Sequence, residues 1–360
     1  MAKGLYIGAT RAFSGKNMLT VGLGLRMQKE GLSIGYMKPV GTMPVERNGV
    51  VGDEDAFFIQ DVLGIDLPSH MASPVMETQD FKMRAFSGQD SDHLPEISSI
   101  YEQVARDRDI MLVCGAGHTL SRKYCRLDGV RLVRELGLKA LIIDRLQHEI
   151  NYDELMMHKE LLGGSLLGAV LNDIPFSFMT EIENVIRPYL ERNGIPVMGI
   201  IPSDPLMGSI RAHELAEGLG GRLVTAQGRA DSMVENFLIG TMQVENFMTY
   251  FRRHPNSAII VGGDRADVQL VAIEGNCPCL VLTGNLFPND IILSRADTLN
   301  VPIVMVRQDT YTIAKQMELL LNRHKMRDVM KIRQGAQLIS DNLDFSALYA
   351  GLGIELNAAS

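Results

Sequence analysis

The sequence predicts an α/β protein of two domains, the first built on a mainly parallel sheet flanked by helices. Short apolar runs alternate with longer amphipathic stretches from one end of the chain to the other. This rhythm is typical of repeated β–α units. The length of 360 residues suits two or three domains. Apolar residues make up 46% of the chain and charged residues 22%, which are ordinary values for a globular protein.

The first domain is expected to begin with a strand over residues 5–9, a glycine-containing loop and a helix over residues 17–30. Apolar runs of strand length follow over residues 34–37, 110–114, 140–143, 166–171 and 197–201. Residues 65–100 contain prolines and many polar side chains, so we expect loops there, over the carboxyl edge of the sheet. Ligands bind at that edge in open α/β sheets.

A second series of strands and helices begins after residue 211. The expected strands cover residues 237–239, 258–261, 279–282 and 303–306, with helices over 244–253, 267–275, 289–300 and 310–322. The boundary is expected near residues 208–222, around Gly218, Gly220 and Gly221. The predicted domains are therefore residues 1–212 and 213–325, and a tail over residues 326–360 is expected to dock on the body or on a partner.

Composition excludes several classes of function. The net charge of −8 argues against nucleic acids and anionic membranes as partners, because both require a basic excess. The four cysteines have no spacing typical of a zinc site. The chain opens without a charged and then apolar leader, and its most apolar stretch, residues 161–171, is too short to span a bilayer. A cytoplasmic protein is therefore expected.

The strongest motif is the segment over residues 8–17, which reads GATRAFSGKN and lies between the first strand and a helix. That context is the one required of a phosphate-binding P-loop. Backbone N–H groups and the helix N-terminus would face an anion, and Lys16 would neutralise phosphate oxygens. Thr10 stands where the common pattern has glycine, and Asn17 where it has Ser or Thr. The alternative is a purely structural strand–helix turn. The residues expected to bind the nucleotide in this segment are Thr10, Arg11, Ser14, Gly15, Lys16 and Asn17.

Several motifs together resemble the dethiobiotin synthetase family and the N-terminal region of long phosphate acetyltransferases. They are Gly15-Lys16, the YMKPV segment over residues 36–40, the DEDA segment over 53–56, the Walker-B-like strand over 109–115, the strand over 168–172 that ends in Asn172, and the strand over 197–202. In the second half, GGDRADV over residues 262–268 and LVLTGN over 280–285 resemble the DRTGG domain, with Asn285 in place of its last glycine. The resemblance implies a P-loop NTPase-like domain followed by a smaller α/β DRTGG-type domain.

The resemblance also assigns roles to single residues. In the synthetases, Mg²⁺ is held at positions that correspond to Asn17, Asp55 and Cys114. A thiol is a poor ligand for Mg²⁺, so Asp55 and Asn17 are left as the candidate metal ligands. We therefore expect weakened Mg²⁺ binding and little nucleotide hydrolysis, while ATP or another nucleotide is still bound.

Further candidates carry two interpretations each. The resemblance makes Lys38 a catalytic residue beside Lys16, but Pro39 also makes it an ordinary lysine held in an extended conformation. Asn172 would either contact the base edge of a nucleotide or cap a turn. Arg11 would either add a second cation to the loop or be a solvated surface residue. In the second domain Asp264 and Arg265, with Thr283 and Gly284, form a ligand or subunit contact, or else Asp264 and Arg265 pair to fix a turn.

Three functions remain open. The first is a regulatory protein that senses a nucleotide or a small anionic metabolite, associates with itself, and acts on an enzyme of acetyl-phosphate or acetyl-CoA metabolism. A separate chain is expected to carry out acetyl transfer, because the 360 residues contain no counterpart of that domain. The second is an ATP-dependent ligase of the dethiobiotin or cobyrinate type. The third is a structural subunit that has lost its ligand.

Overall fold

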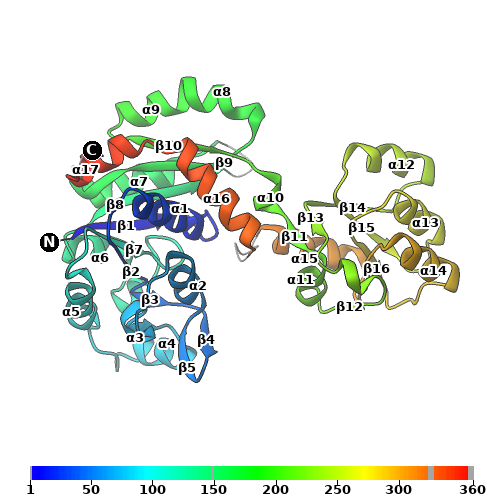
Figure 1. The fold of residues 1–360 in the computed structure, drawn as a ribbon, viewed down its shortest axis with the longest axis horizontal. Helices are drawn as coiled ribbons and strands as arrows, with labels where there is room; N and C mark the ends of the chain where they lie inside the picture. Colours follow the sequence, from blue (N-terminus) through cyan, green and yellow to red (C-terminus); the bar gives the residue numbers. More distant parts are fainter. Residues whose placement is uncertain (1, 147–149, 323–327, 356–360) are drawn as a thin grey trace. The chain divides into compact units, whose positions relative to one another are not determined.

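The computed structural model describes residues 2–146, 150–322 and 328–355. Its contacts divide the chain into two compact units (Figure 1). The first comprises Met1–Ser203 together with Met326–Ser360, and the second comprises Asp204–Lys325. Among the described residues, no helix has both the length and the apolar character needed to cross a membrane.

The first unit is built on a six-stranded sheet in the order β10-β9-β8-β1-β7-β2, in which all neighbouring strands are parallel. The strands are β1 (Lys3–Ala9), β2 (Ile34–Met37), β7 (Ile110–Cys114), β8 (Lys139–Arg145), β9 (Leu166–Ile174) and β10 (Val197–Pro202). Because helices cover both faces, the strands are almost continuously apolar and buried, as in parallel sheets generally. The predicted α/β class with a mainly parallel sheet is confirmed.

Short strands and helices complete the first unit. The strands form two small sheets, β3 (Val40–Gly41) with β6 (Val75–Met76), and β4 (Pro44–Arg47) with β5 (Val50–Asp53). The helices are α1 (Lys16–Lys29), α2 (Glu54–Leu63), α3 (Ser69–Ala72), α4 (Gln79–Phe86), α5 (Leu94–Ala105), α6 (Gly129–Glu135), α7 (Asp153–Leu162), α8 (Met179–Glu181), α9 (Arg187–Arg192), α16 (Val329–Asn342) and α17 (Phe345–Leu352). Four short helical segments also belong to this unit. Three are 3₁₀ turns, namely η1 (Lys123–Cys125), η2 (Gly163–Ser165) and η3 (Phe176–Phe178). The fourth, η4 (Ile182–Ile186), is a π-helical turn that joins α8 to α9.

The expectation of loops over residues 65–100 was wrong, because α3, β6, α4 and the start of α5 occupy much of this segment. Thr78 caps α4 by accepting a hydrogen bond from the backbone N–H of Phe81. Pro95 lies in the first turn of α5, where its missing N–H costs nothing. Thr78 and Pro95 therefore mark helix starts rather than loops.

Two glycines of α1 allow other helices to approach it closely. A Cβ atom at Gly22 would lie 2.5 Å from the Cβ of Ile339 in α16, and one at Gly24 would lie 2.6 Å from a methyl group of Leu63 in α2. Arg26 of α1 also donates a hydrogen bond of 2.9 Å to Ser340. The C-terminal helices thus dock on the first unit beside the helix that follows the candidate phosphate loop (Figure 1).

We expect Gly22→Val to destabilise the first unit by about 1–3 kcal/mol, since the new side chain overlaps Ile339 in a packed contact. Thermal unfolding of the variant measures the loss. Adding Ile339→Ala should recover part of it, whereas Gly164→Val, at a glycine with open space around it, serves as the control. A Gly22→Val protein as stable as the parent would contradict the close packing of α16 on α1.

The second unit is a five-stranded sheet in the order β12-β17-β16-β15-β14, parallel except for the antiparallel edge strand β12. The strands are β12 (Arg222–Leu223), β14 (Asn236–Ile239), β15 (Ser257–Gly262), β16 (Leu280–Thr283) and β17 (Ile303–Met305), and β11 (Ile210–Arg211) pairs with β13 (Met233–Val234). The helices are α10 (Pro205–Gly208), α11 (Ala212–Gly218), α12 (Val244–Arg253), α13 (Ala266–Glu274), α14 (Asp290–Leu299) and α15 (Thr310–Asn322), with one 3₁₀ turn, η5 (Gln227–Arg229).

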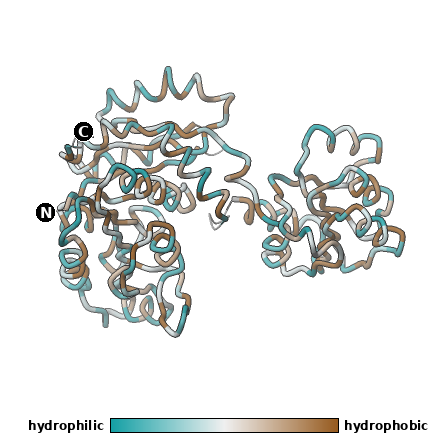
Figure 2. The backbone as a smooth tube through the Cα atoms, viewed as in Figure 1, coloured by the Kyte–Doolittle hydropathy of each residue, from teal (hydrophilic) through white to brown (hydrophobic). Residues whose placement is uncertain are grey.

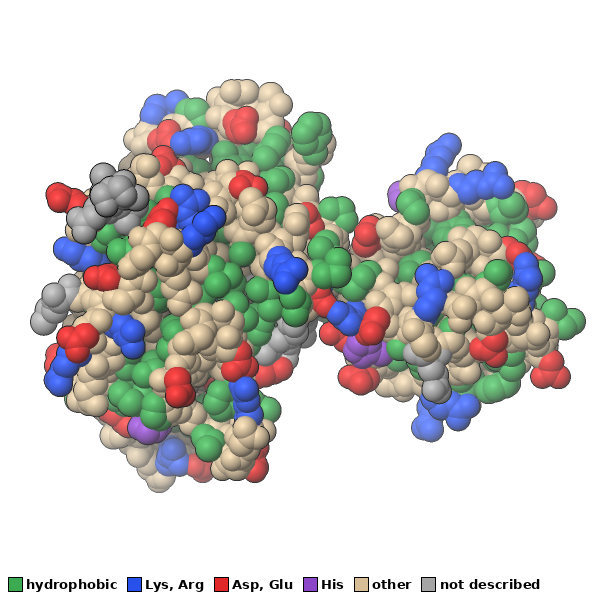
Figure 3. All heavy atoms as spheres, in the orientation of Figure 1, with side chains coloured by type: hydrophobic (Ala, Val, Ile, Leu, Met, Phe, Trp, Pro, Cys, Tyr) green, Lys and Arg blue, Asp and Glu red, His purple; other side chains and the backbone are tan. Residues whose placement is uncertain are grey.

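The apolar residues of the second unit form two clusters. One contains residues of α11 and α15, and the other contains residues of α12, α13 and α14. Figure 2 shows that apolar residues are concentrated along the strands of each unit. Acidic and basic side chains are interspersed over the visible face of both units (Figure 3).

Candidate functional site

The loop between β1 and α1 is held in shape by contacts from neighbouring strands. Gly15 has a φ of 106°, and a Cβ there would lie 2.5 Å from the Asn172 side-chain nitrogen. Glycine is therefore required at this position. The buried Asn172, near the end of β9, donates a hydrogen bond of 2.8 Å from Nδ2 to the Ser14 carbonyl. Asn172 thus fixes the loop directly, whichever ligand the loop takes.

A second anchor of the loop is Asp144, near the end of β8, which the sequence interpretation missed. Thr10 donates a 2.6 Å hydrogen bond from Oγ1 to Asp144 Oδ1, and both side chains are buried. The available signal was an acidic residue directly after the buried run over residues 140–143, at the carboxyl edge of the sheet. Arg11, in contrast, is exposed and pairs with the half-buried Glu154 at 2.9 Å.

Burial raises the pKa of the Asp144 carboxyl from 3.8 to about 6, opposed by the Thr10 hydrogen bond. A raised folded-state pKa costs stability when the group is ionised. The cost is absent below pH 4, grows as the pH rises from 4 to 6, and is then constant at about 3 kcal/mol. We expect Asp144→Asn, which still accepts from Thr10, to be more stable than the parent at pH 7 by up to this amount.

Thermal unfolding across pH 4–8 measures this difference, which should vanish near pH 4. Asp66→Asn, at an exposed aspartate, is the matched control. A stability gap between Asp144→Asn and the parent that does not change with pH would contradict the assignment.

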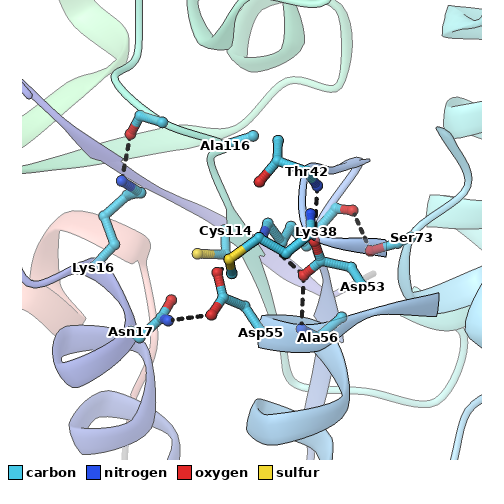
Figure 4. A network of polar contacts seen from close by, with 12 residues as sticks. Lys16, Asn17, Lys38, Thr42, Asp53, Asp55, Ala56, Ser73, Cys114 and Ala116 are labelled. Atoms are coloured by element: carbon cyan, nitrogen blue, oxygen red, sulfur yellow. Dashed lines mark hydrogen bonds and ion pairs between the residues drawn. The ribbon is translucent and has the colours of Figure 1, made fainter. Parts of the chain in front are cut away.

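Lys16 begins α1 and lies half-buried among the loops. Its ammonium group donates a hydrogen bond to the backbone carbonyl of Gly117, in the loop after β7 (Figure 4). Burial lowers the pKa of this lysine, an effect that the neighbouring Lys38 reinforces. A cation whose hydrogen-bond partner is a neutral carbonyl, at a helix N-terminus, is suited to take up an anion.

Lys38 lies at the centre of an ion-paired cluster (Figure 4). Its Nζ atom lies 2.8 Å from Asp53 Oδ1 and 3.0 Å from Asp55 Oδ2, and its side chain is only 4% exposed. Burial would lower the pKa of Lys38, but the carboxylates of Asp55 and Asp53 outweigh it and raise that pKa. Lys38 is therefore a buried, charged member of the site and not merely an extended lysine before Pro39.

Asp53 closes the turn from β5 into α2. Its carboxylate accepts hydrogen bonds from the backbone N–H groups of Thr42, Met43 and Ala56 at 2.8–3.0 Å, in addition to Lys38. Burial opposes ionisation, but Lys38 and these N–H groups lower the pKa of Asp53. Asp53 thus caps α2 and anchors the Lys38 ammonium group at once.

The residues expected to hold Mg²⁺ are brought together but do not fit the ion. Asn17 Nδ2 donates a 2.9 Å hydrogen bond to Asp55 Oδ1, while Lys38 engages Asp55 Oδ2, so both carboxylate oxygens accept from protein donors. Cys114, at the end of β7, is buried, and burial raises the pKa of its thiol. A neutral thiol and an amide that faces a carboxylate through its nitrogen are not the oxygen ligands that Mg²⁺ requires. In the described part of the chain, no three His, Cys, Asp or Glu side chains are grouped to hold a metal.

In the second unit, the predicted regulatory residues lie at the carboxyl ends of two adjacent strands, β15 and β16. Arg265 pairs with Asp267, not with Asp264 as the turn interpretation expected, through two contacts of 2.9 Å. Asp267 is two residues further on, in the first turn of α13, and its carboxylate accepts hydrogen bonds from Nε and Nη2 of Arg265. Thr283 Oγ1 lies 2.8 Å from Thr310 Oγ1 at the start of α15, and Gly284 has a φ of 82°.

The parallel sheet, the loop from β1 to α1 and Lys16 together define a P-loop α/β domain. Residues 3–211 match the family model described as AAA domain, and residues 214–320 match the DRTGG domain. Because the first match covers more than half of the chain, the chain belongs to this AAA domain family, and its AAA domain is followed by a DRTGG domain. The predicted combination of the two domains is confirmed.

Relatives of known name fall into two groups. The chain is 23% identical over 368 residues to a phosphate acetyltransferase of Pseudomonas putida, with 97% of this chain and 52% of the relative covered. It is 25% identical over 211 residues to an ATP-dependent dethiobiotin synthetase of Methanocaldococcus jannaschii, with 55% of this chain and 94% of the relative covered. The chain spans about half the length of the phosphate acetyltransferases it matches.

Two solved structures are also similar to parts of the chain. The cell division ATPase MinD of Pyrococcus furiosus has a TM-score of 0.35 and 17% identity, with 57% of this chain and 86% of MinD covered. The CBS and DRTGG domains of a Clostridium perfringens pyrophosphatase, complexed with diadenosine tetraphosphate, have a TM-score of 0.26 and 15% identity. That match covers 40% of this chain and 71% of the other.

Proposed function

We propose that this chain is a nucleotide-sensing regulatory protein. Its P-loop binds the phosphates of ATP or another nucleotide, and its DRTGG domain passes the bound state to a partner. The observation that carries the proposal is Lys16, a half-buried ammonium group at the N-terminus of α1 whose hydrogen-bond acceptor is the Gly117 carbonyl. A phosphate group at this position would supply the counter-charge.

The shape of the loop supports the same function. Thr10 is held by Asp144 and the Ser14 carbonyl by Asn172, so the loop is tied at both ends by buried side chains. A loop held in place before binding loses less conformational entropy when a ligand arrives. These contacts favour a ligand-binding loop over a purely structural turn.

The second half of the proposal concerns the DRTGG domain. Arg265 and Thr283 lie at the carboxyl ends of neighbouring strands, a common position for ligand or subunit contacts in parallel sheets. The similarity to phosphate acetyltransferases suggests an enzyme of acetyl-phosphate or acetyl-CoA metabolism as the partner, and we propose that the chain associates with itself. The ligand must bind two conformations with different affinity for such sensing to work.

Hydrogen exchange with and without saturating ATP tests this function. We expect ATP to protect the amides of residues 9–17 and, in the same experiment, to change exchange over residues 262–285. Lys16→Ala should need about tenfold to a hundredfold more ATP to show either effect. Protection confined to the P-loop would contradict the regulatory half of the proposal, and exchange unaffected by ATP anywhere would contradict nucleotide binding.

A further inference from the structure

The Lys38 cluster occupies the position at which the resemblance places a metal ion. Asn17 in α1, Asp55 in α2 and Cys114 at the end of β7 are the three corresponding residues, and Lys38, directly after β2, contacts Asp55 among them (Figure 4). The ammonium nitrogen of Lys38 lies 3.0 Å from Asp55 Oδ2 and 2.8 Å from Asp53 Oδ1. A cation of the protein itself therefore already contacts the carboxylate that a metal would require.

The cluster holds one ammonium group and two carboxylates, a formal charge of −1, and neutral N–H donors supply the other hydrogen bonds to these carboxylates. Asp53 has a side chain that is 0% exposed and receives Lys38 together with three backbone N–H groups. Asp55 is 16% exposed and receives Lys38 and the Asn17 amide. A divalent ion at this position would have to compete with Lys38 for Asp55, and Mg²⁺ gives up its own water reluctantly. Coordination by Asn17 and the Cys114 thiol would not compensate the ion for these costs.

We propose that Lys38 supplies the fixed positive charge that a divalent cation supplies elsewhere, so that this chain binds its phosphate ligand as a metal-free anion. The inference rests on the proposed function for the identity of the ligand, but the replacement of the metal does not. An ammonium group has three N–H donors, and two are directed at Asp53 and Asp55. The ligand class is a free nucleotide rather than its Mg²⁺ complex.

Direct titration of Mn²⁺ into the ligand-free protein, followed by electron paramagnetic resonance, tests the replacement. We expect the parent to bind no Mn²⁺ at this position at concentrations up to about 100 µM. Lys38→Met, which leaves both carboxylates without their cation, should gain one site, and adding Asp55→Asn should abolish it. Lys29→Met, at an exposed lysine of α1, is the matched control and should gain no site.

Two results would overturn the proposal. One is a Mn²⁺ site in the parent that Asp55→Asn removes. This comparison of the parent with Asp55→Asn tests the proposal even if Lys38→Met fails to fold. The other is a folded Lys38→Met that binds no Mn²⁺, because the position would then not be one that a metal can enter.

Calorimetric titration of ATP separates this inference from the proposed function. In the parent we expect the Kd for ATP in Mg²⁺ and in EDTA to agree within about threefold, whereas Lys38→Met should bind ATP at least tenfold more weakly in EDTA than in Mg²⁺. A parent that loses more than tenfold in affinity on chelation would overturn the metal-free proposal. A parent that binds no nucleotide under either condition would overturn the proposed function. In that case the Mn²⁺ titration by itself would still test whether Lys38 takes the place of a metal ion.

Discussion

Lys16→Ala should weaken ATP binding by about tenfold to a hundredfold while leaving the protein folded. The estimate follows from hydrogen bonds to charged groups, which contribute about 1.5–3 kcal/mol each. In the absence of ligand Lys16 gives a hydrogen bond to the neutral Gly117 carbonyl, so its loss should cost little stability. Calorimetric titration of ATP into the parent and the variant measures the change in affinity.

Lys29→Ala is the matched control for this experiment, because Lys29 lies at the exposed far end of the same helix. Its affinity for ATP should equal that of the parent. If Lys16→Ala bound ATP as tightly as the parent, the P-loop would not be the nucleotide site.

The largest loss of stability is expected from Lys38→Met. Removing one partner of a buried ion pair costs about 3–5 kcal/mol, because the remaining charge stays buried without compensation. Here two carboxylates, Asp53 and Asp55, lose the same cation, and the side chain of Asp53 is 0% exposed. Urea denaturation followed by circular dichroism measures the effect on the first unit.

The double variant Lys38→Met with Asp55→Asn removes one of the two uncompensated charges, and we expect it to recover part of the lost stability. Lys29→Met should change the free energy of unfolding by no more than about 0.5 kcal/mol, as most surface substitutions do. A loss below 1 kcal/mol for Lys38→Met would mean that this cluster is more solvated and less important to the fold than the contacts indicate.

Much of the fold could be predicted because the buried strands of a parallel sheet are continuous apolar runs. The expected strand over residues 110–114 coincides with β7 (Ile110–Cys114), and the one over 5–9 lies within β1 (Lys3–Ala9). The prediction of loops over residues 65–100 was wrong for the opposite reason. Its helices α3 and α4 are short and α4 is largely exposed, so little apolar periodicity marks them, and tertiary contacts and the Thr78 cap decide their structure.

The candidate site could be predicted as a set of residues but not as a network. Motif positions single out Lys16, Lys38 and Asp55, and the structure brings Lys38 and Asp55 into contact. That Lys38 would bond both Asp53 and Asp55 depends on how the chain folds back through β4 and β5, which spacing does not reveal. Asp144 was missed because no motif includes it, although it directly follows a buried strand segment.

The most direct test of the central claim is a calorimetric titration of ATP, ADP, GTP and acetyl-CoA into the intact chain in the presence of EDTA. We expect saturable binding of a nucleotide, one per chain, with an affinity that added Mg²⁺ leaves unchanged and that Lys16→Ala greatly weakens. Absence of binding by every one of these ligands, with and without Mg²⁺, would contradict it and would favour a structural subunit that has kept the P-loop fold without its ligand.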